Sequence, residues 1–196
     1  MRMPDPDQQV IARRRQIAES LRQLVPGEGV IFDEDERRAY ESDGLTAYAA
    51  LPLLVVLPET TAQVAAVLRF CQKEGVKVVP RGAGTSLSGG ALPLEDGILL
   101  GLGKFNRILE VDYENRCAVV QPGVTNLGIT NAVEADGFYY APDPSSQIAC
   151  TIGGNVAENS GGVHCLKYGL TTNNLLGLEM VLIDGTVIRV GGKHLD

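Results

Sequence analysis

The segment Pro80–Gly90 constrains this chain more than any other feature. It reads PRGAGTSLSGG and directly follows a short apolar run that predicts a β-strand. Glycine adopts positive φ at no steric cost and lets a ligand approach the backbone closely. Successive free N–H groups then form a concavity that binds anions. With the hydroxyl groups of Thr85, Ser86 and Ser88 as further donors, the segment suits a diphosphate without needing much positive charge.

Two common nucleotide-binding motifs do not fit this segment. A Rossmann fingerprint needs a third glycine and a following helix, but Leu87 holds the third position and Pro93 follows soon after. A Walker A loop needs Lys and Ser or Thr at its end, where Gly90 and Ala91 stand. A ligand-free surface loop is the remaining alternative at this point.

Two further stretches rich in glycine and small residues weigh against a plain surface loop. Gln121–Val124 reads QPGV and lies between a predicted strand and a predicted helix. The stretch 142–162 contains PDPSS, TIGGN and NSGG in succession. Because each stretch lies where one element gives way to the next, the pattern predicts one extended ligand threaded between two lobes.

The hydrophobic pattern predicts a mixed α+β fold. Thr60 or Thr61 can cap a helix that Gly75 ends, and Asp184-Gly185 predicts a hairpin turn. Periodicity predicts helices over 8–24, 34–41, 60–74, 126–136 and 151–159, and strands over 53–57, 76–79, 98–100, 108–111, 118–120, 176–183 and 186–190. We expect an N-terminal helical segment (1–50), a first lobe (51–115) and a second lobe (116–196).

Charge and composition exclude several classes of protein. The formal net charge of −7 disfavours a nucleic-acid partner. The basic run Arg13–Arg15 is interpreted as a solvated helix face. No stretch of 18 apolar residues predicts a transmembrane helix, and the acidic N-terminus does not resemble a signal peptide. A cytoplasmic protein is therefore expected, in which Cys71, Cys117, Cys150 and Cys165 act as small apolar packing residues.

At three motifs the chain resembles a known family. These are PRGAGTSLSGG (80–90), the pair ILEVD…AVVQPGV (108–124), and PDPSSQIACTIGGNVAENSGG (142–162) followed by KYG (167–169). The chain is similar to the FAD-binding domain of the vanillyl-alcohol oxidase/PCMH flavoprotein superfamily, within the branch of the glycolate oxidase flavoproteins and D-lactate dehydrogenase. The resemblance covers residue 10 to the end.

The resemblance implies a two-lobed PCMH-type FAD-binding domain of α+β class, with the C-terminal cap domain absent. It implies that the 80–90 loop holds the FAD pyrophosphate and that the other glycine-bearing segments line the rest of the cofactor. The implied cofactor-binding residues are Pro80, Arg81, Gly82, Ala83, Gly84, Thr85, Ser86, Gly90, Pro122, Gly123, Val124, Pro142, Asp143, Pro144, Ser145, Ser146, Thr151, Ile152, Gly153, Gly154, Asn155, Asn159, Gly161, Gly162, Tyr168, Gly169, Val187 and Ile188.

The implied reaction is oxidation of an α-hydroxy acid, of the glycolate or D-lactate type, to an α-keto acid by hydride transfer to flavin N5. Noncovalent FAD is expected, because no His or Cys lies between Arg81 and Gly90. Backbone N–H groups at a helix start over 151–155 are the candidate for stabilising negative charge on the flavin. In the family the catalytic residues lie in the cap, so no catalytic base and no metal site is assigned in this chain, which alone is expected to be inactive.

Single side chains leave some alternatives open. His164 is expected to be packed or hydrogen-bonded, and His194 to be exposed. Lys167 is expected to lie on the surface. Arg81 either supports the phosphates or pairs with a nearby acid.

Three functions remain in competition. The chain is the FAD-binding portion of a larger dehydrogenase, or a stand-alone FAD-binding subunit that needs a partner chain, or a non-catalytic module for ADP or CoA. The expected partners are a small 2-hydroxy acid and the other subunits of a glycolate oxidase-like complex, through which a cytoplasmic chain could lie at the inner membrane.

Overall fold

The computed structural model describes residues 3–193, which form two compact units. The first unit comprises the chain up to Leu102 together with Val181–Val187. The second comprises Gly103–Met180 and the chain from Ile188 onward. The lobe boundaries expected after residues 50 and 115 stay a prediction, and each unit is described by itself.

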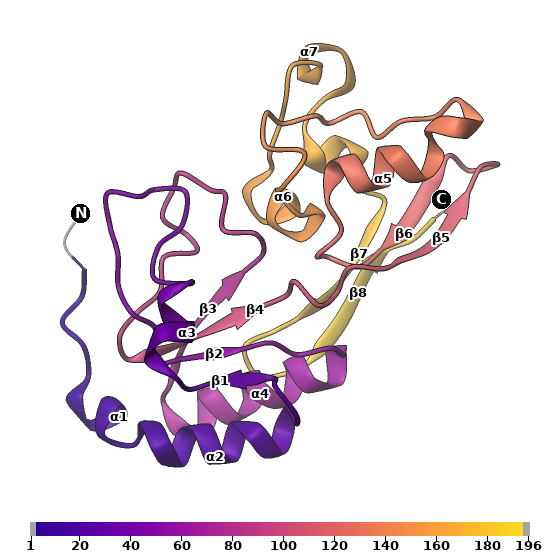
Figure 1. Cartoon of the computed structure of the whole chain (residues 1–196). Coiled ribbons are helices and arrows are strands. Elements are labelled where there is room, and N and C mark those ends of the chain that lie inside the picture. Colours follow the sequence, from indigo (N-terminus) through magenta and orange to yellow (C-terminus); the bar gives the residue numbers. More distant parts are fainter. Residues whose placement is uncertain (1–2, 194–196) are drawn as a thin grey trace. The chain divides into compact units, whose positions relative to one another are not determined.

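A four-stranded sheet forms the centre of the first unit (Figure 1). Its order is β1 (Val30–Ile31), β2 (Leu54–Val56), β4 (Gly97–Gly101) and β3 (Lys77–Arg81). Strand β4 runs parallel to both β2 and β3, and β1 is antiparallel to β2. All residues of β2 and β4 are buried, which explains why both strands are continuous apolar runs instead of alternating ones.

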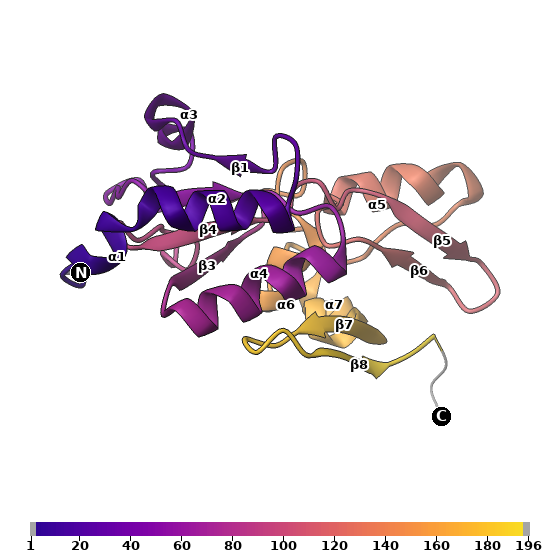
Figure 2. The same ribbon diagram turned by 90° about the horizontal axis from the view of Figure 1, so that it is seen from below.

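Helices α2 (Arg14–Leu24) and α4 (Thr61–Glu74) lie side by side on one face of this sheet (Figure 1 and Figure 2). The predicted ends of α4 are confirmed. The Thr60 hydroxyl accepts a hydrogen bond from the backbone N–H of Gln63 at 3.2 Å, and Gly75 ends the helix in the left-handed conformation at φ +68°. The core-facing side of α4 consists of Val64, Ala65, Val67, Leu68 and Cys71.

The single helix predicted over 8–24 is wrong at one residue. Helix α1 (Gln8–Ala12) ends at Arg13, whose ψ of 6° is not helical, and α2 begins at the next residue. The Arg13 side chain donates to the carboxylate and to the backbone carbonyl of Glu74, each at 3.0 Å. The helix predicted over 34–41 is shorter, because α3 spans Glu34–Arg38.

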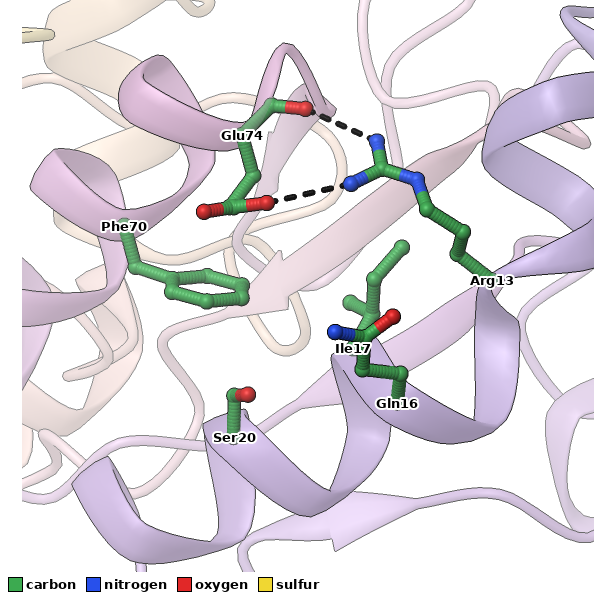
Figure 3. Close-up of a pocket in the computed structure, with 6 residues that line it drawn as sticks. All are labelled: Arg13, Gln16, Ile17, Ser20, Phe70 and Glu74. Carbon is green, nitrogen blue, oxygen red and sulfur yellow. Dashed lines mark hydrogen bonds and ion pairs between the residues drawn. The ribbon is translucent and has the colours of Figure 1, made fainter.

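The basic run is also not a uniformly solvated face. Arg14 donates to the carbonyl of Phe32 at 2.8 Å, with its guanidinium carbon 4.2 Å from the centre of that ring, so only Arg15 stays exposed. Beside Arg13 and Glu74 lies a pocket of about 60 Å³ (Figure 3), which is lined by Arg13, Gln16, Ile17, Ser20, Phe70 and Glu74. It is far smaller than the ~300 Å³ that small-molecule sites usually offer.

The second unit starts with a hairpin of β5 (Ile108–Asp112) and β6 (Cys117–Val120), which pair antiparallel with a bulge after Ile108. Helix α5 (Asn126–Val133) follows, capped by the Thr125 hydroxyl, and a 3-10 turn, η1 (Glu134–Asp136), extends it. Gly137 ends this turn at φ +80°. The predicted helix over 126–136 is thus confirmed, with a tighter last turn.

The remaining elements are short. The sequence predicts helix α6 (Ile152–Glu158), but not α7 (Cys165–Tyr168), the 3-10 turn η2 (Thr171–Asn174) or β1. Strands β7 (Gly177–Val181) and β8 (Val187–Gly191) pair across the predicted turn, where Gly185 has φ +77°. Within residues 3–193, the helices all lack the length and apolar character needed to cross a membrane.

Candidate functional site

The glycine loop, defined as residues 82–90, begins where β3 ends in the first unit. Gly84 and Gly89 have φ of +71° and +76°, a conformation that other residues adopt at a cost. Two of the four glycines in the loop therefore have the positive φ that the sequence predicts. The exposed surface of the loop includes Ala83, Thr85, Leu87, Ser88 and Gly90.

The backbone N–H groups of this loop are largely unused. Among residues 3–193, no acceptor is found for the N–H groups of residues 82–87. Further along, the N–H of Ser88 donates to the Ser86 hydroxyl at 3.0 Å, and that of Leu92 to the Gly89 carbonyl at 3.2 Å. A run of free donors on a glycine-opened backbone is the arrangement that binds a phosphate or diphosphate without a cationic side chain.

Arg81 precedes the loop and is occupied by neighbouring backbone. Its Nη1 donates to the carbonyls of Ser42 at 2.7 Å and of Tyr40 at 3.4 Å. Burial lowers the pKa of the Arg81 guanidinium, and the nearby Asp43 and Tyr40 partly offset that effect. The sequence left open whether Arg81 supports the phosphates or pairs with a nearby acid. Asp43 is near enough to affect Arg81 electrostatically, but the hydrogen bonds of Nη1 go to backbone carbonyls.

In the second unit, the predicted segments 122–124 and 151–155 lie against each other. The N–H groups of Ile152 and Gly153 donate to the carbonyls of Val124 and Pro122, at 2.8 and 2.9 Å. A Cβ on Gly153 would lie 2.6 Å from the Cβ of Pro122, so only glycine permits this contact. The Thr151 hydroxyl is buried and has no partner within the described chain.

These contacts bear on one expectation. The start of α6 is the sequence-based candidate for donating N–H groups to a flavin, yet Ile152 and Gly153 already donate to other segments, and Asn155 donates to the carbonyl of Thr151 at 3.0 Å. An N–H group with a buried protein acceptor is not available to a ligand. The N–H of Gly154 and the hydroxyl of Thr151 have no acceptor among the described residues, so these two donors remain for a ligand.

A buried asparagine that the sequence reasoning missed joins three of the predicted segments. The Nδ2 of Asn126, a residue only 1% exposed, donates to the Pro142 carbonyl at 3.2 Å. Its Oδ1 accepts from the Nδ2 of Asn155 and from the thiol of Cys150. Asn126 therefore ties the loop at 142, the residue before Thr151, and helix α6 together. An asparagine at the start of a largely apolar helix is the only sequence signal for this role.

Asp143 and the glycines at 161–162 form a second cluster in this unit. A Cβ on Gly162 would lie 2.1 Å from the carbonyl oxygen of Asp143, so the two backbones are in direct contact. The His164 side chain contacts Asp143 through Nδ1 and Oδ2 at 2.7 Å, and the His164 N–H donates to Oδ1 at 3.3 Å. Burial opposes ionisation of Asp143, but these hydrogen bonds outweigh it and place its pKa below the ordinary value. The expectation that His164 is hydrogen-bonded is confirmed.

The motif 167–169 lies next to this cluster. Tyr168 packs edge-on against Tyr139, with ring centres 6.1 Å apart, and the hydroxyl of Tyr139 and the ammonium of Lys167 lower the pKa of Tyr168. Gly169 has φ +80° and packs against the Asn173 side chain. Lys167 is exposed as expected, with its Nζ 4.9 Å from the centre of the Tyr168 ring.

Other predicted residues have fewer contacts. Ser160, beside Asn159, donates through its N–H to the Asn155 carbonyl at 2.9 Å. Val187 and Ile188 lie on β8, and their role at the adenine end stays a prediction. Cys165 is not merely a packing residue, because its thiol donates to the Gly162 carbonyl at 2.6 Å. His194 lies outside the described residues.

The donors present fit the diphosphate of FAD in the first unit, where the six consecutive N–H groups of residues 82–87 have no acceptor in the described part of the chain. In the second unit, two observations fit a flat organic ligand that the backbone approaches closely. The Thr151 hydroxyl has no partner among the described residues, and glycines allow backbone segments to lie in direct contact. Nowhere in residues 3–193 do three or more His, Cys, Asp or Glu side chains group in a way that could hold a metal ion.

Comparison with known proteins places this chain in a family. The model of the FAD binding domain matches residues 52–191. Glycolate oxidase subunit GlcD of Escherichia coli K12 is 54% identical over 194 residues, which are 99% of this chain and 38% of that protein. GlcD of Bacillus subtilis is 46% identical, covering 83% of this chain and 35% of the relative. The D-lactate dehydrogenase of Archaeoglobus fulgidus is 45% identical, covering 75% of this chain and 33% of the relative.

Solved structures show the same fold. Alkyldihydroxyacetonephosphate synthase superposes with a TM-score of 0.81 at 20% identity, over 97% of this chain and 36% of that one. The 4-ethylphenol oxidase of Gulosibacter chungangensis gives 0.79 at 27% identity, over 96% and 36%. The chain thus spans little more than a third of the relatives it matches. The expected PCMH-type fold is confirmed, and the chain belongs to the FAD binding domain family, with FAD as its cofactor.

Proposed function

We propose that the chain is the FAD-binding portion of a flavin-dependent dehydrogenase that oxidises a small 2-hydroxy acid, of the glycolate or D-lactate type, to the keto acid. The observation that carries this proposal is the run of free N–H groups over residues 82–87 in a chain that resembles GlcD along nearly its whole length. The names of the relatives supply the substrate class.

FAD supplies the acceptor for the hydride that leaves the substrate carbon, at flavin N5. The residues of this chain bind and orient the cofactor. The glycine loop would donate backbone N–H groups to the two phosphates, and the Thr151 hydroxyl and the segments 122–124, 142–146 and 159–162 would hold the rest of the cofactor. No His or Cys lies between Arg81 and Gly90, and noncovalent FAD therefore remains part of the proposal.

The described residues do not supply an obvious base for the hydroxyl proton of the substrate. His164 is the one histidine among them, and its Nδ1 already contacts Asp143. We therefore assign the base and the carboxylate-binding cation to the part of the longer protein that this chain does not span. The GlcD relatives are named as subunits, so partner subunits belong to the same proposal, as does a cytoplasmic chain that reaches the inner membrane through them.

The visible spectrum of the purified chain tests the proposal. We expect flavin bands at about 375 and about 450 nm that copurify with the chain and are released by heat or acid. Glycolate or D-lactate should bleach these bands in a protein as long as the relatives, and not in the 196-residue chain alone. A colourless chain that takes up ADP or CoA but not FAD would contradict the proposal and favour the non-catalytic nucleotide-binding module.

A further inference from the structure

A segment outside the family match lies directly against the glycine loop. The brace segment, defined as residues 40–45, precedes the matched region, which begins at residue 52. It belongs to the same compact unit as the loop. Nothing in the sequence pattern connects the two, since about 40 residues separate them in the chain.

The first link between them is the Arg81 side chain. Its Nη1 bridges two carbonyls of the brace segment, those of Ser42 and Tyr40. On its other side the guanidinium lies beneath the loop, because a Cβ on Gly84 would lie 2.4 Å from Nη2 and 2.6 Å from Nε. One planar, charged group is thus enclosed between the brace segment and the loop backbone. A lysine cannot reproduce this arrangement, since its ammonium lacks the rigid planar fork.

The second link is a direct backbone contact. A Cβ on Gly44 would lie 2.6 Å from the carbonyl oxygens of both Thr85 and Ser86. Side chains do not approach backbone oxygens so closely, so the position requires glycine whatever its φ. The carbonyls of Thr85 and Ser86 face Gly44, and the direction of these carbonyls fixes that of the peptide N–H groups that follow them, those of Ser86 and Leu87.

Asp43 holds the brace segment in place. It is 5% exposed, and its Oδ1 accepts from the backbone N–H of Leu45 at 2.9 Å. Its Oδ2 is buried without a hydrogen-bond partner among the described residues. A buried carboxylate needs a nearby opposite charge, and Arg81 is close enough for the two side chains to affect each other electrostatically. The pair leaves little net charge beneath the loop, so binding of a diphosphate depends on the directions of the loop N–H groups.

We propose that the brace segment, linked through Arg81 and Gly44, positions the N–H groups of the glycine loop for the diphosphate of the cofactor. This inference rests on the proposed function. It adds Arg81, Gly44 and Asp43 as positioning residues that act through the loop backbone, and it extends the cofactor site to residues before the matched family region.

Dissociation constants for FAD and for ADP test the inference, because ADP carries the same diphosphate without the flavin. Gly44→Ala pushes a methyl group into two loop carbonyls, and Arg81→Lys keeps the charge but loses the bridge. We expect both dissociation constants to rise about tenfold in Arg81→Lys and by more in Gly44→Ala, as for the loss of well-placed hydrogen bonds. Matched controls are Gly103→Ala, where an added Cβ meets no atom within 4 Å, and Arg38→Lys at an exposed position.

The melting temperature of each ligand-free variant separates positioning from a purely structural role. Variants that melt earlier but bind FAD and ADP as tightly as the unmodified chain would overturn the inference and leave the proposed function intact. If Gly44→Ala does not fold, Arg81→Lys alone decides. An unmodified chain that binds neither FAD nor ADP would instead contradict the proposed function itself.

Discussion

The two units hold their parts of the candidate site by different means. In the first unit the glycine loop extends from a sheet whose central strands are entirely apolar and buried, and the contacts of Arg81 and Gly44 position the loop itself. In the second unit the candidate segments are fastened by buried polar groups, above all Asn126 and Asn155, and by glycines in direct contact with other backbone. Fully buried large apolar side chains are concentrated in the first unit.

This difference predicts how each unit responds to substitution. Apolar packing is non-directional, so damage to it lowers stability without redirecting a particular loop. Hydrogen bonds of a buried amide fix both distance and direction, and a half-satisfied buried network costs more than an apolar core. We therefore expect the first unit to separate stability from cofactor binding, and the second to couple them.

The largest effect is expected for Leu99→Ala in the first unit. Leu99 is fully buried at the centre of β4, paired with Val55 and Val79 on either side. Removing its side chain leaves a cavity that lowers the free energy of unfolding by about 3 kcal/mol. Urea unfolding followed by circular dichroism measures this loss, while the FAD dissociation constant of the folded variant should change by less than about twofold. The control is Leu166→Ala, because that side chain is fully exposed.

A somewhat smaller loss of stability, with a larger loss of binding, is expected for Asn126→Ala. The substitution leaves Asn155, Cys150 and the Pro142 carbonyl without their partner. Unsatisfied buried groups of this kind cost about 2 kcal/mol, and the loop at 142 loses its attachment, so FAD should bind about tenfold more weakly. Asn131→Ala, at an exposed position on the same helix, is the control. Unchanged FAD affinity in Asn126→Ala would break the contrast between the units.

The third prediction concerns the buried charge of the first unit. Asp96 is 2% exposed, and its Oδ2 accepts from Lys77 at 2.6 Å and from the Asp7 N–H at 2.8 Å. Burial opposes its ionisation, but these partners outweigh burial and lower its pKa. A lowered folded-state pKa stabilises the fold above the unfolded value of about 3.9, and this stability is lost as pH falls through the folded-state pKa.

Asp96→Asn tests that sign. At pH 7 the variant should be less stable by about 1 kcal/mol, a modest figure because Lys77 is 44% exposed and partly screened. The two proteins should converge in urea unfolding as the pH is lowered below about 4. A constant difference between pH 7 and pH 3 would show that the ionised form of Asp96 contributes nothing.

Features that depend only on adjacent residues could be predicted from the sequence. The Thr60 cap, the left-handed Gly75 and the Asp184-Gly185 turn each specify local backbone geometry, and the glycine loop is recognisable by its composition. The break at Arg13 could not be predicted, because the periodicity continues through it. The helix is interrupted at Arg13, whose side chain pairs with Glu74, 61 residues away.

The candidate site shows the same limit. The sequence names the segments that line it, but not the residues that fasten them. Asn126 is visible only as a helix start, and Gly44 lies in a stretch without any motif. Both act through contacts with distant backbone, with Pro142 and with Thr85 and Ser86 respectively. The N–H groups of Ile152 and Gly153 at the start of α6 are also occupied through such contacts, which the sequence pattern does not reveal.

The smallest perturbation, labelling of the native cysteines, compares the two units in one molecule. Burial raises the pKa of the Cys71 thiol in the first unit to about 12, so it reacts only when the unit opens. Cys150, buried in the second unit, is held by Asn126, whereas Cys117 and Cys165 are half-buried. With a thiol reagent at pH 8 we expect Cys117 and Cys165 to react first, then Cys150, and Cys71 last.

This order of labelling follows because a small polar core opens at lower free energy than an apolar sheet. Peptide mapping of the labelled chain reads the order directly. If the polar core supports the cofactor, FAD should slow the labelling of Cys150 more than that of Cys71. If Cys71 were labelled before Cys150, the apolar sheet of the first unit would be the part that opens at lower free energy. The expectation that cofactor binding and stability are coupled in the second unit alone would then be wrong.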